Sequence, residues 1–268
     1  MIRREKDINL IIGGVICAVL LSVMAIGLFV TPHDPNTMNA ATRFAGASGT
    51  HLLGCDNFGR DTLSRVMVGS QTTLMVAVLT VFFGATLGIV MGALTGYFGG
   101  VVDEVLMRIN DALFAFPVIL MVLVFVSVIG SGRSTIIIAI GIAFVPSFAR
   151  IVRSEVVKQR ELDYVIAARL SGAGDGRIIF VHILPNTLST LLPALIIGFN
   201  NAILAETGMS YLGIGVQPPD PSLGRMLAEA QTYLFRAPLM TLVPGLTLIL
   251  LILGFSLLSD GVTNLTKR

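Results

Sequence analysis

Residues 8–31 read INLIIGGVICAVLLSVMAIGLFVT, a run without a single charged side chain. Arg3, Arg4 and Lys6 precede it, and it ends at Thr31-Pro32 rather than at a small-residue cleavage site. A helix needs about 20 apolar residues to cross about 30 Å of hydrocarbon, because each residue advances it by about 1.5 Å. The run is also longer than the apolar core of a cleaved signal peptide. It therefore predicts a retained first transmembrane helix.

Further stretches of this kind lie between charged residues. They are 74–97, 112–132, 134–149, 183–205 and 237–259, and we expect the short 134–149 stretch to continue through Arg150 and Ile151. The chain is 54% hydrophobic and only 13% charged, whereas about 25% of residues are charged in a typical soluble domain. So little charge cannot cover a water-facing surface. We predict an all-α integral membrane protein with six transmembrane helices.

The distribution of Lys and Arg predicts the orientation of the chain, because short segments rich in these residues stay in the cytoplasm. With the N-terminus inside, the inner segments hold twelve of the 18 Lys and Arg residues. Both termini are therefore expected in the cytoplasm. The predicted parts are a cytoplasmic N-terminus (1–7), the first transmembrane helix (8–31), an extracytoplasmic segment (32–73), a core of five transmembrane helices (74–262) and a cytoplasmic tail (263–268). Within the core we expect an inner loop, 150–186, and an outer loop, 206–236.

Several kinds of chemistry lack support in the sequence. No ionisable residue lies in the middle of a predicted span, where a charge costs about 2.5–3.5 kcal/mol and usually marks an ion pathway. This disfavours an ion-coupled secondary transporter and an intramembrane enzyme. The chain has no G-x-x-x-x-G-K-[ST] phosphate loop, and its net charge of +2 gives no case for a nucleic-acid partner. The scattered histidines predict no metal site: His33, His51 and His182.

Glycines recur every four residues along the second span and just beyond it, and this spacing makes a stripe of bare backbone on one helix face. Such a stripe lets two helices approach closely in lipid, where packing drives association. Two alternatives stay open, namely packing within the subunit and contact with a partner permease subunit. The glycines of this ladder are Gly84, Gly88, Gly92, Gly96 and Gly100.

The inner loop 150–186 is the most informative segment. Residues 161–170 predict a short helix, which glycines at 172, 174 and 176 then stop, because repeated glycines are unfavourable in a helix interior. A second short helix is expected over residues 177–184, ending at Pro185. Two short helices joined by a glycine corner on the inner face predict a knob on which another protein can dock.

This loop resembles a known family signature. The pattern Ala167-Ala168-x3-Gly172-x9-His182-x-Leu184-Pro185 resembles the EAA loop of bacterial ABC importer permeases, E-A-A-x3-G-x9-I-x-L-P. Ile166 and His182 depart from it in a way usual in the dipeptide/oligopeptide/nickel branch. Residues 53–61 (LGCDNFGRD), 103–117, 206–215, 217–224 (QPPDPSLG) and 254–261 (GFSLLSDG) resemble further elements of the C-type subunit of that branch, in the family's order.

The resemblance implies a type I ABC importer permease fold with a cytoplasmic coupling helix, and no catalytic residue on this chain. It implies a homologous permease, two ABC ATPases that carry ATP and Mg, an extracytoplasmic substrate-binding protein and a place in the bacterial inner membrane. It also implies an ATPase-coupling set, which comprises Asp163, Tyr164, Ala167, Ala168, Arg169, Gly172, His182 and Pro185.

The outer elements carry a second group of candidates. Asp56, Arg60, Asp61 and Arg65 predict a local set of ion pairs that braces the outer segment, with direct substrate contact as the alternative. Glu206 is expected to pair with an arginine of a neighbouring chain, or else to line the path. The proline-rich turn that begins at Gln217 and Pro218 is stiff and suits a platform for the binding protein.

The function favoured by these features is peptide import, with nickel or a metal chelate as the alternative cargo. The numerous methionines are interpreted as packing residues rather than as metal ligands. Two functions of other classes remain to be weighed against transport by an ABC importer. One is a membrane scaffold that uses 150–186 only for docking, and the other is an ion-coupled secondary transporter.

Overall fold

The computed structural model describes residues 2–266, and within that range the regular structure is helical, with no strand. Five helical segments are long and apolar enough to cross a membrane. They contain α1 (Ile2–Phe29), α2 (Thr62–Phe98), α5 (Arg133–Gln159), α8 (Leu184–Tyr211) and α10 (Leu239–Thr266). A sixth span results if α3 (Gly100–Ala115) and α4 (Val118–Ile129), which are bent by 90°, count as one. The predicted all-α membrane fold is confirmed.

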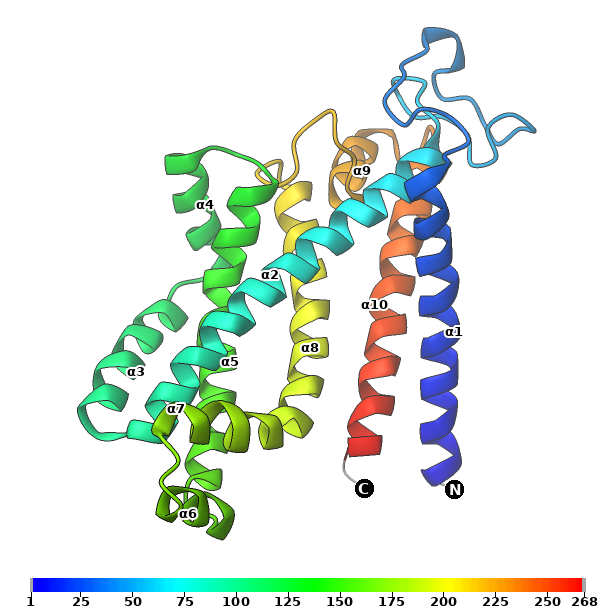
Figure 1. Cartoon of the computed structure of the whole chain (residues 1–268). Coiled ribbons are helices and arrows are strands. Elements are labelled where there is room, and N and C mark those ends of the chain that lie inside the picture. The colour runs from blue at the N-terminus through cyan, green and yellow to red at the C-terminus, as the bar shows by residue number, and fades with distance from the viewer. Residues whose placement is uncertain (1, 267–268) are drawn as a thin grey trace.

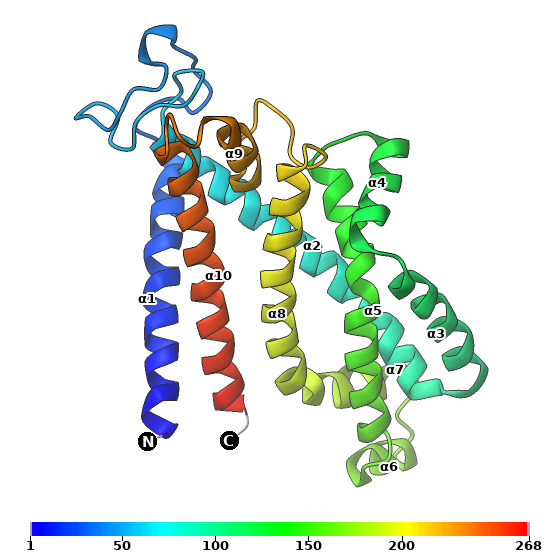
Figure 2. The ribbon, with the colours of Figure 1, turned by 180° about the vertical axis from the view of Figure 1, so that it is seen from behind.

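The helices form two groups that α2 connects. α1 and α10 lie side by side, α5 and α8 lie together, and α2 runs diagonally between the groups (Figures 1 and 2). Glycine permits the close approach of α1 and α10, since a Cβ at Gly13 would lie 2.8 Å from the Cβ of Leu257. At about 1.5 Å per residue, the 37 residues of α2 extend about 55 Å, which is longer than the hydrocarbon layer.

The two ends of the bundle differ in content. The start of α1, the end of α10 and the short helix α6 (Asp163–Leu170) lie at one end, which we call the inner end (Figure 1). Residues 30–61, with the 3₁₀ turn η1 (Ala40–Thr42), and α9 (Leu223–Ala230), followed by the 3₁₀ turn η3 (Gln231–Tyr233), lie at the opposite, outer end. This grouping agrees with the predicted sidedness, although the direction of the bundle across a membrane stays a prediction.

The expected third span, 112–132, is wrong as a single helix. Residues 112–115 end α3, and α4 starts only at Val118. Phe116 has extended backbone angles (φ −82°, ψ 126°), because the ring of a following proline, here Pro117, disfavours helical geometry in the residue before it. The expected continuation of the fourth span through Arg150 and Ile151 is confirmed, and α5 extends further, to Gln159, over 27 residues.

Two loop boundaries also need correction. The extracytoplasmic segment 32–73 is irregular only as far as Asp61, which caps α2 by accepting a hydrogen bond from the Ser64 backbone N–H at 2.8 Å. The expected second inner helix does not end at Pro185. Instead α7 (Asp175–Arg177) and a π-helical segment η2 (Ile178–Ile183) lead directly into α8. Pro185 lies in the first turn of α8, directly after η2.

Candidate functional site

The short helix α6 projects from the inner end of the bundle (Figure 1). Its most buried side chain is Val165, which has no exposed surface and belongs to a core cluster with Tyr97, Val156 and Ile178. Tyr164 and Ala168 of α6 are partly buried and pack against the same cluster. Another side of α6 is apolar and exposed. Leu162, Ile166 and Leu170 are 48%, 45% and 85% exposed, and their spacing of four residues places them along one side of the helix. This exposed apolar side suits a protein partner.

Polar contacts join α6 to the inner end of α2. Arg169 donates a hydrogen bond to the Tyr97 hydroxyl at 3.3 Å, and its guanidinium lies 5.7 Å from the centre of the Tyr97 ring. The same hydroxyl donates to the Asp175 carboxylate at 2.6 Å. Arg160 donates to the carbonyl oxygen of Gly96 at 2.9 Å. Tyr97 thus connects both sides of the corner to the second transmembrane helix.

The glycine corner ends α6 with a left-handed residue. Gly172 has φ +83°, a conformation that other residues adopt only with strain. The Ser171 and Ala173 N–H groups donate to the carbonyls of Ala167 and Ala168 at 2.9 and 3.1 Å. No heavy atom lies within 4 Å of a Cβ built at Gly172, so the corner is open to a partner.

The other predicted coupling residues divide between two elements. Asp163 and Tyr164 start α6, and the Tyr164 hydroxyl donates to the side chain of Gln159. His182 is half-buried in η2, and Pro185 is exposed at the start of α8. The structure therefore groups six of the predicted residues around α6 and places the last two on the following helical segment.

Four of the five ladder glycines face α5 in the same chain. A Cβ at Gly84 would lie 2.6 Å from the Gly141 carbonyl oxygen, and one at Gly92 would lie 2.5 Å from the Ala149 carbonyl oxygen. Gly88 and Gly96 meet α5 in the same way. Gly100 does not belong to this contact, because it starts α3 and has nothing within 4 Å of its built Cβ. The stripe 84–96 serves packing within the subunit.

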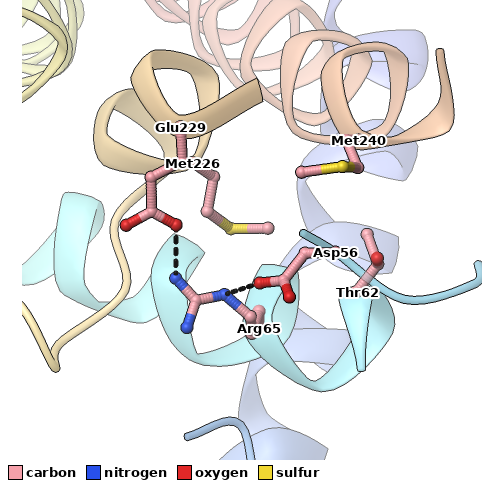
Figure 3. Close-up of a pocket in the computed structure, with 6 residues that line it drawn as sticks. All are labelled: Asp56, Thr62, Arg65, Met226, Glu229 and Met240. Atoms are coloured by element: carbon pink, nitrogen blue, oxygen red, sulfur yellow. Dashed lines mark hydrogen bonds and ion pairs between the residues drawn. The ribbon is translucent and has the colours of Figure 1, made fainter. Parts of the chain in front are cut away.

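The outer end contains a buried network of charges (Figure 3). Arg60 contacts Asp56 and Glu229, each at 2.6 Å, and Arg65 contacts the same two carboxylates at 3.6 and 3.3 Å. Arg65 is only 1% exposed. Arg225 also reaches Glu229 at 3.2 Å. Three of the four residues predicted to form ion pairs therefore meet in this network, which is buried and connects the outer segment with α9.

Asp61 has a separate role in capping α2. It accepts hydrogen bonds from the Ser64 backbone and hydroxyl at 2.8 and 2.7 Å, and it contacts the His51 ring at 2.9 Å. Burial alone would raise the pKa of Asp61, but the hydrogen bonds from Ser64 and His51 outweigh burial and hold that pKa below its ordinary value.

The expected pairing of Glu206 with an arginine of a neighbouring chain does not agree with this structure. Glu206 has no exposed surface with which to reach another chain or to line a path. Its carboxylate accepts a hydrogen bond from the Ser210 hydroxyl at 2.7 Å within α8. Gln217 donates to the carbonyls of Gly213 and Gly215, so it closes its own turn, which continues into Pro218. An exposed ion pair of 2.8 Å between Arg133 and Asp220 joins this turn to α5.

Sequence reasoning missed Glu229 and Arg225, which complete the outer network. Their spacing of four residues is that of an ion pair along a helix, and this was the available signal. Glu229 lies 169 and 164 residues from Arg60 and Arg65, and this separation hid the contact across the chain.

A cavity of about 290 Å³ opens between α5 and α8. Its wall is largely apolar but includes the exposed side chains of Ser147 and Asn201. Polar side chains exposed at mid-length of membrane-spanning helices are unusual unless they face a partner or a water-filled passage. The wall is formed by Phe144, Ser147, Phe148, Ile151, Ala194, Ile197, Gly198 and Asn201.

The helical arrangement is that of a type I ABC importer permease. The chain superposes on a subunit from "Inward facing conformations of the MetNI methionine ABC transporter" with a TM-score of 0.60, 19% identity, and coverage of 76% of this chain and 97% of that one. A subunit from "Crystal structure of an amino acid ABC transporter with histidines" matches with a TM-score of 0.57, 18% identity, and coverage of 75% and 93%. At these identities the likeness concerns the fold alone.

Sequence similarity defines the family. The model of the binding-protein-dependent transport system inner membrane component matches residues 84–268, and the chain belongs to that family. It is 35% identical to the dipeptide transport system permease protein DppC of Alkalihalophilus pseudofirmus, covering 97% of this chain and 86% of that protein. It is 40% identical to a putative peptide transport system permease protein of Brucella suis (98% and 88% covered), and 35% identical to the glutathione transport system permease protein GsiD of Pectobacterium atrosepticum (94% and 84%). The chain is a multi-pass membrane permease.

Proposed function

We propose that this chain is one of two permease subunits of an ATP-driven peptide importer in a bacterial cytoplasmic membrane, with both termini in the cytoplasm. The observation that carries the proposal is α6, which has an exposed apolar side and a buried anchor. It lies at the end of the bundle that also holds the start of α1 and the end of α10. The chain carries no ATP-binding loop. ATP and Mg are therefore bound by separate ATPase subunits, for which α6 is the docking helix.

Coupling requires that movement at α6 reaches the transmembrane helices. The contacts of Arg169 and Asp175 with Tyr97 join the docking corner directly to α2. Closure of two ATPases on nucleotide binding would move α6 and bias the bundle between two arrangements. No residue of this chain takes part in hydrolysis.

The translocation path is assigned to the face of α5 and α8 that carries the open cavity with Ser147 and Asn201. A second, homologous permease facing this surface would complete the path. The extracytoplasmic binding protein delivers its cargo to the outer end, where the network around Arg65 holds α9 and the outer segment in place.

Peptide is the favoured cargo because the relatives of this chain are named for dipeptide, peptide and glutathione transport. Nickel or a metal chelate is the alternative within the same architecture. A transport assay on the purified complex with its binding protein separates the two. Uptake of a labelled dipeptide supports the proposal, and uptake of Ni²⁺ without peptide uptake overturns its cargo.

The docking role is tested by a double substitution, Ile166→Asp with Leu170→Asp, in the assembled importer. Both side chains are exposed, so the bundle is expected to fold while ATPase docking and uptake are lost. Lys158→Gln, in an exposed side chain of the same inner end, is the matched control and is expected to transport normally. Full uptake by the double variant would contradict the docking role.

The same experiment separates the proposal from the two other classes. A scaffold would bind its ATPase-like partner without any uptake by the wild-type complex. A secondary transporter would move substrate in vesicles that contain an ion gradient but no ATP. ATP-dependent uptake by the wild-type complex excludes both.

A further inference from the structure

His33 and His51 lie close together beside Asp61, the residue that immediately precedes α2. The His51 Nδ1 atom lies 2.9 Å from Asp61 Oδ1, and the His33 Nδ1 atom lies 3.7 Å from the same oxygen. The two imidazole rings are 4.5 Å apart between centroids and tilted by 31°. Both rings therefore direct a nitrogen toward one carboxylate oxygen at the outer end of the molecule.

The separations suit a single metal ion. The ligand atoms of His33, His51 and Asp61 all lie within 4.8 Å of one another. Tetrahedral zinc with bonds of about 2.0–2.2 Å places neighbouring ligand atoms about 3.3 Å apart, and the two distances to the Asp61 oxygen lie on either side of that value. The His33 side chain is 41% exposed, so it is the ligand that is free to adjust.

Surrounding hydrogen bonds hold the ligands in position. The buried Ser64 donates through its N–H and hydroxyl to the second Asp61 oxygen, which leaves the first oxygen for the histidines. The Ser64 hydroxyl oxygen also accepts the backbone N–H of His33 at 3.0 Å. The backbone N–H of His51 donates to the Ser48 hydroxyl at 3.1 Å. Such outer contacts orient the ligands of metal sites.

The donor set defines the class of ion. Two imidazoles and one carboxylate suit zinc and related divalent transition metals, whereas Ca²⁺ and Mg²⁺ prefer sites made of oxygen alone. Because the His33 side chain is 41% exposed, water would complete the coordination of a bound ion.

We infer that His33, His51 and Asp61 form a binding site for a divalent transition-metal ion, with Zn²⁺ as the probe. The ion would join the chain just after α1, the middle of the outer segment and the first turn of α2. It would hold residues 33–61 as a closed loop. The inference concerns this loop alone and does not depend on the transported cargo.

The test uses the full-length importer complex, purified without a histidine tag and stripped with a chelator. Titration with Zn²⁺ against a competing indicator is expected to give one ion per chain. His33→Gln and His51→Gln are each expected to weaken binding by about 100-fold or more, because loss of a ligand exceeds the 10–100-fold cost of losing an outer contact. Cobalt substitution supplies a second readout, since visible absorption bands report a protein-bound Co²⁺ ion.

Two controls keep the result specific. His182→Gln removes the remaining histidine of the chain, and Cys55→Ser removes a thiol close to Asp61. Both variants are expected to bind Zn²⁺ like the wild type. Zn²⁺ is also expected to protect residues 33–61 from proteolysis in the wild type but not in His33→Gln. Absence of saturable Zn²⁺ binding by the wild type, or unchanged binding by both His33→Gln and His51→Gln, overturns the inference.

Discussion

The outer and inner ends of this bundle are stabilised in opposite ways. At the outer end, three arginines and two carboxylates are largely withdrawn from water and satisfy one another across α2, α9 and the outer segment. At the inner end, α6 is held by the buried Val165, by partly buried neighbours and by a polar contact to Tyr97, while Ile166 and Leu170 remain exposed. Buried charges must be fully paired, whereas a patch of exposed apolar side chains marks a surface that binds a partner.

This difference indicates which end is able to move. A network of buried charges tolerates few alternative arrangements, because displacing one member leaves another unpaired in a medium of low polarity. The contacts of α6 are few and lie near water, so its position is exchangeable at smaller cost. The outer end therefore acts as the fixed part of the subunit, and the inner end as the responsive part.

The largest effect on the stability of the outer end is expected from the removal of Glu229. Glu229→Ala leaves Arg60 and Arg65 to share Asp56 and removes the partner of Arg225. It is expected to destabilise the chain by about 3–5 kcal/mol, the usual cost of breaking a buried ion pair. Thermal unfolding in detergent measures the effect. Asp220→Ala removes the exposed pair with Arg133 and is expected to cost less than about 1 kcal/mol. Equal losses of stability in the two variants would show that the buried outer network stabilises the chain no more than an exposed ion pair does.

The contact between α2 and α5, which joins the two ends, is tested next. Gly92→Ala places a Cβ about 2.5 Å from the Ala149 carbonyl oxygen, and such overpacking is expected to cost about 1–3 kcal/mol. Gly14→Ala in α1 is the matched control, since the nearest atom to its Cβ would be 4.0 Å away. The control is expected to be neutral or stabilising, because alanine favours a helix. A neutral Gly92→Ala in the same unfolding measurement would contradict close packing at this contact.

A smaller effect is expected at the anchor of the inner end. Tyr97→Phe removes the hydrogen bonds to Asp175 and Arg169, which together are worth about 1–2 kcal/mol. Hydrogen exchange is expected to accelerate in residues 163–178 and to stay unchanged around Arg65. Acceleration at both ends would mean that they are not stabilised independently.

The smallest effect on stability is expected at the tip of α6. Leu170→Ser changes a side chain that is 85% exposed, so the unfolding free energy should change by less than about 0.5 kcal/mol. Uptake by the importer is nevertheless expected to fall, because the apolar contact with the ATPase is lost. Val165→Ala, on the buried side of α6, should instead destabilise the helix. A large loss of stability in Leu170→Ser would show that this side chain is structural.

Features encoded locally could be predicted from the sequence. The absence of charge located the membrane helices, the glycine corner located the end of α6, and the four-residue glycine period located the face of α2 that meets α5. The break at Phe116–Pro117 was missed because charge spacing does not register a proline.

Contacts between distant segments could not be predicted. Arg65 and Glu229 are 164 residues apart, and nothing in either local pattern indicates the other. His33 and His51 likewise meet only because the outer segment folds back onto the start of α2. The contact of Arg65 with Glu229 depends on the return of the chain to the outer end along α8, whereas the histidine contact depends on the fold of the outer segment itself.

The uninterrupted length of α2 has a mechanical consequence. Its first turn is fixed in the outer charge network, and its last turn holds the tyrosine that touches α6. A rod about 55 Å long that swings by about 5° displaces its free end by about 5 Å, roughly one helical turn. Under the proposed mechanism, a small tilt of α2 about its outer end would move its inner end, together with the closely packed α5, by a distance large enough to change a passage through the bundle.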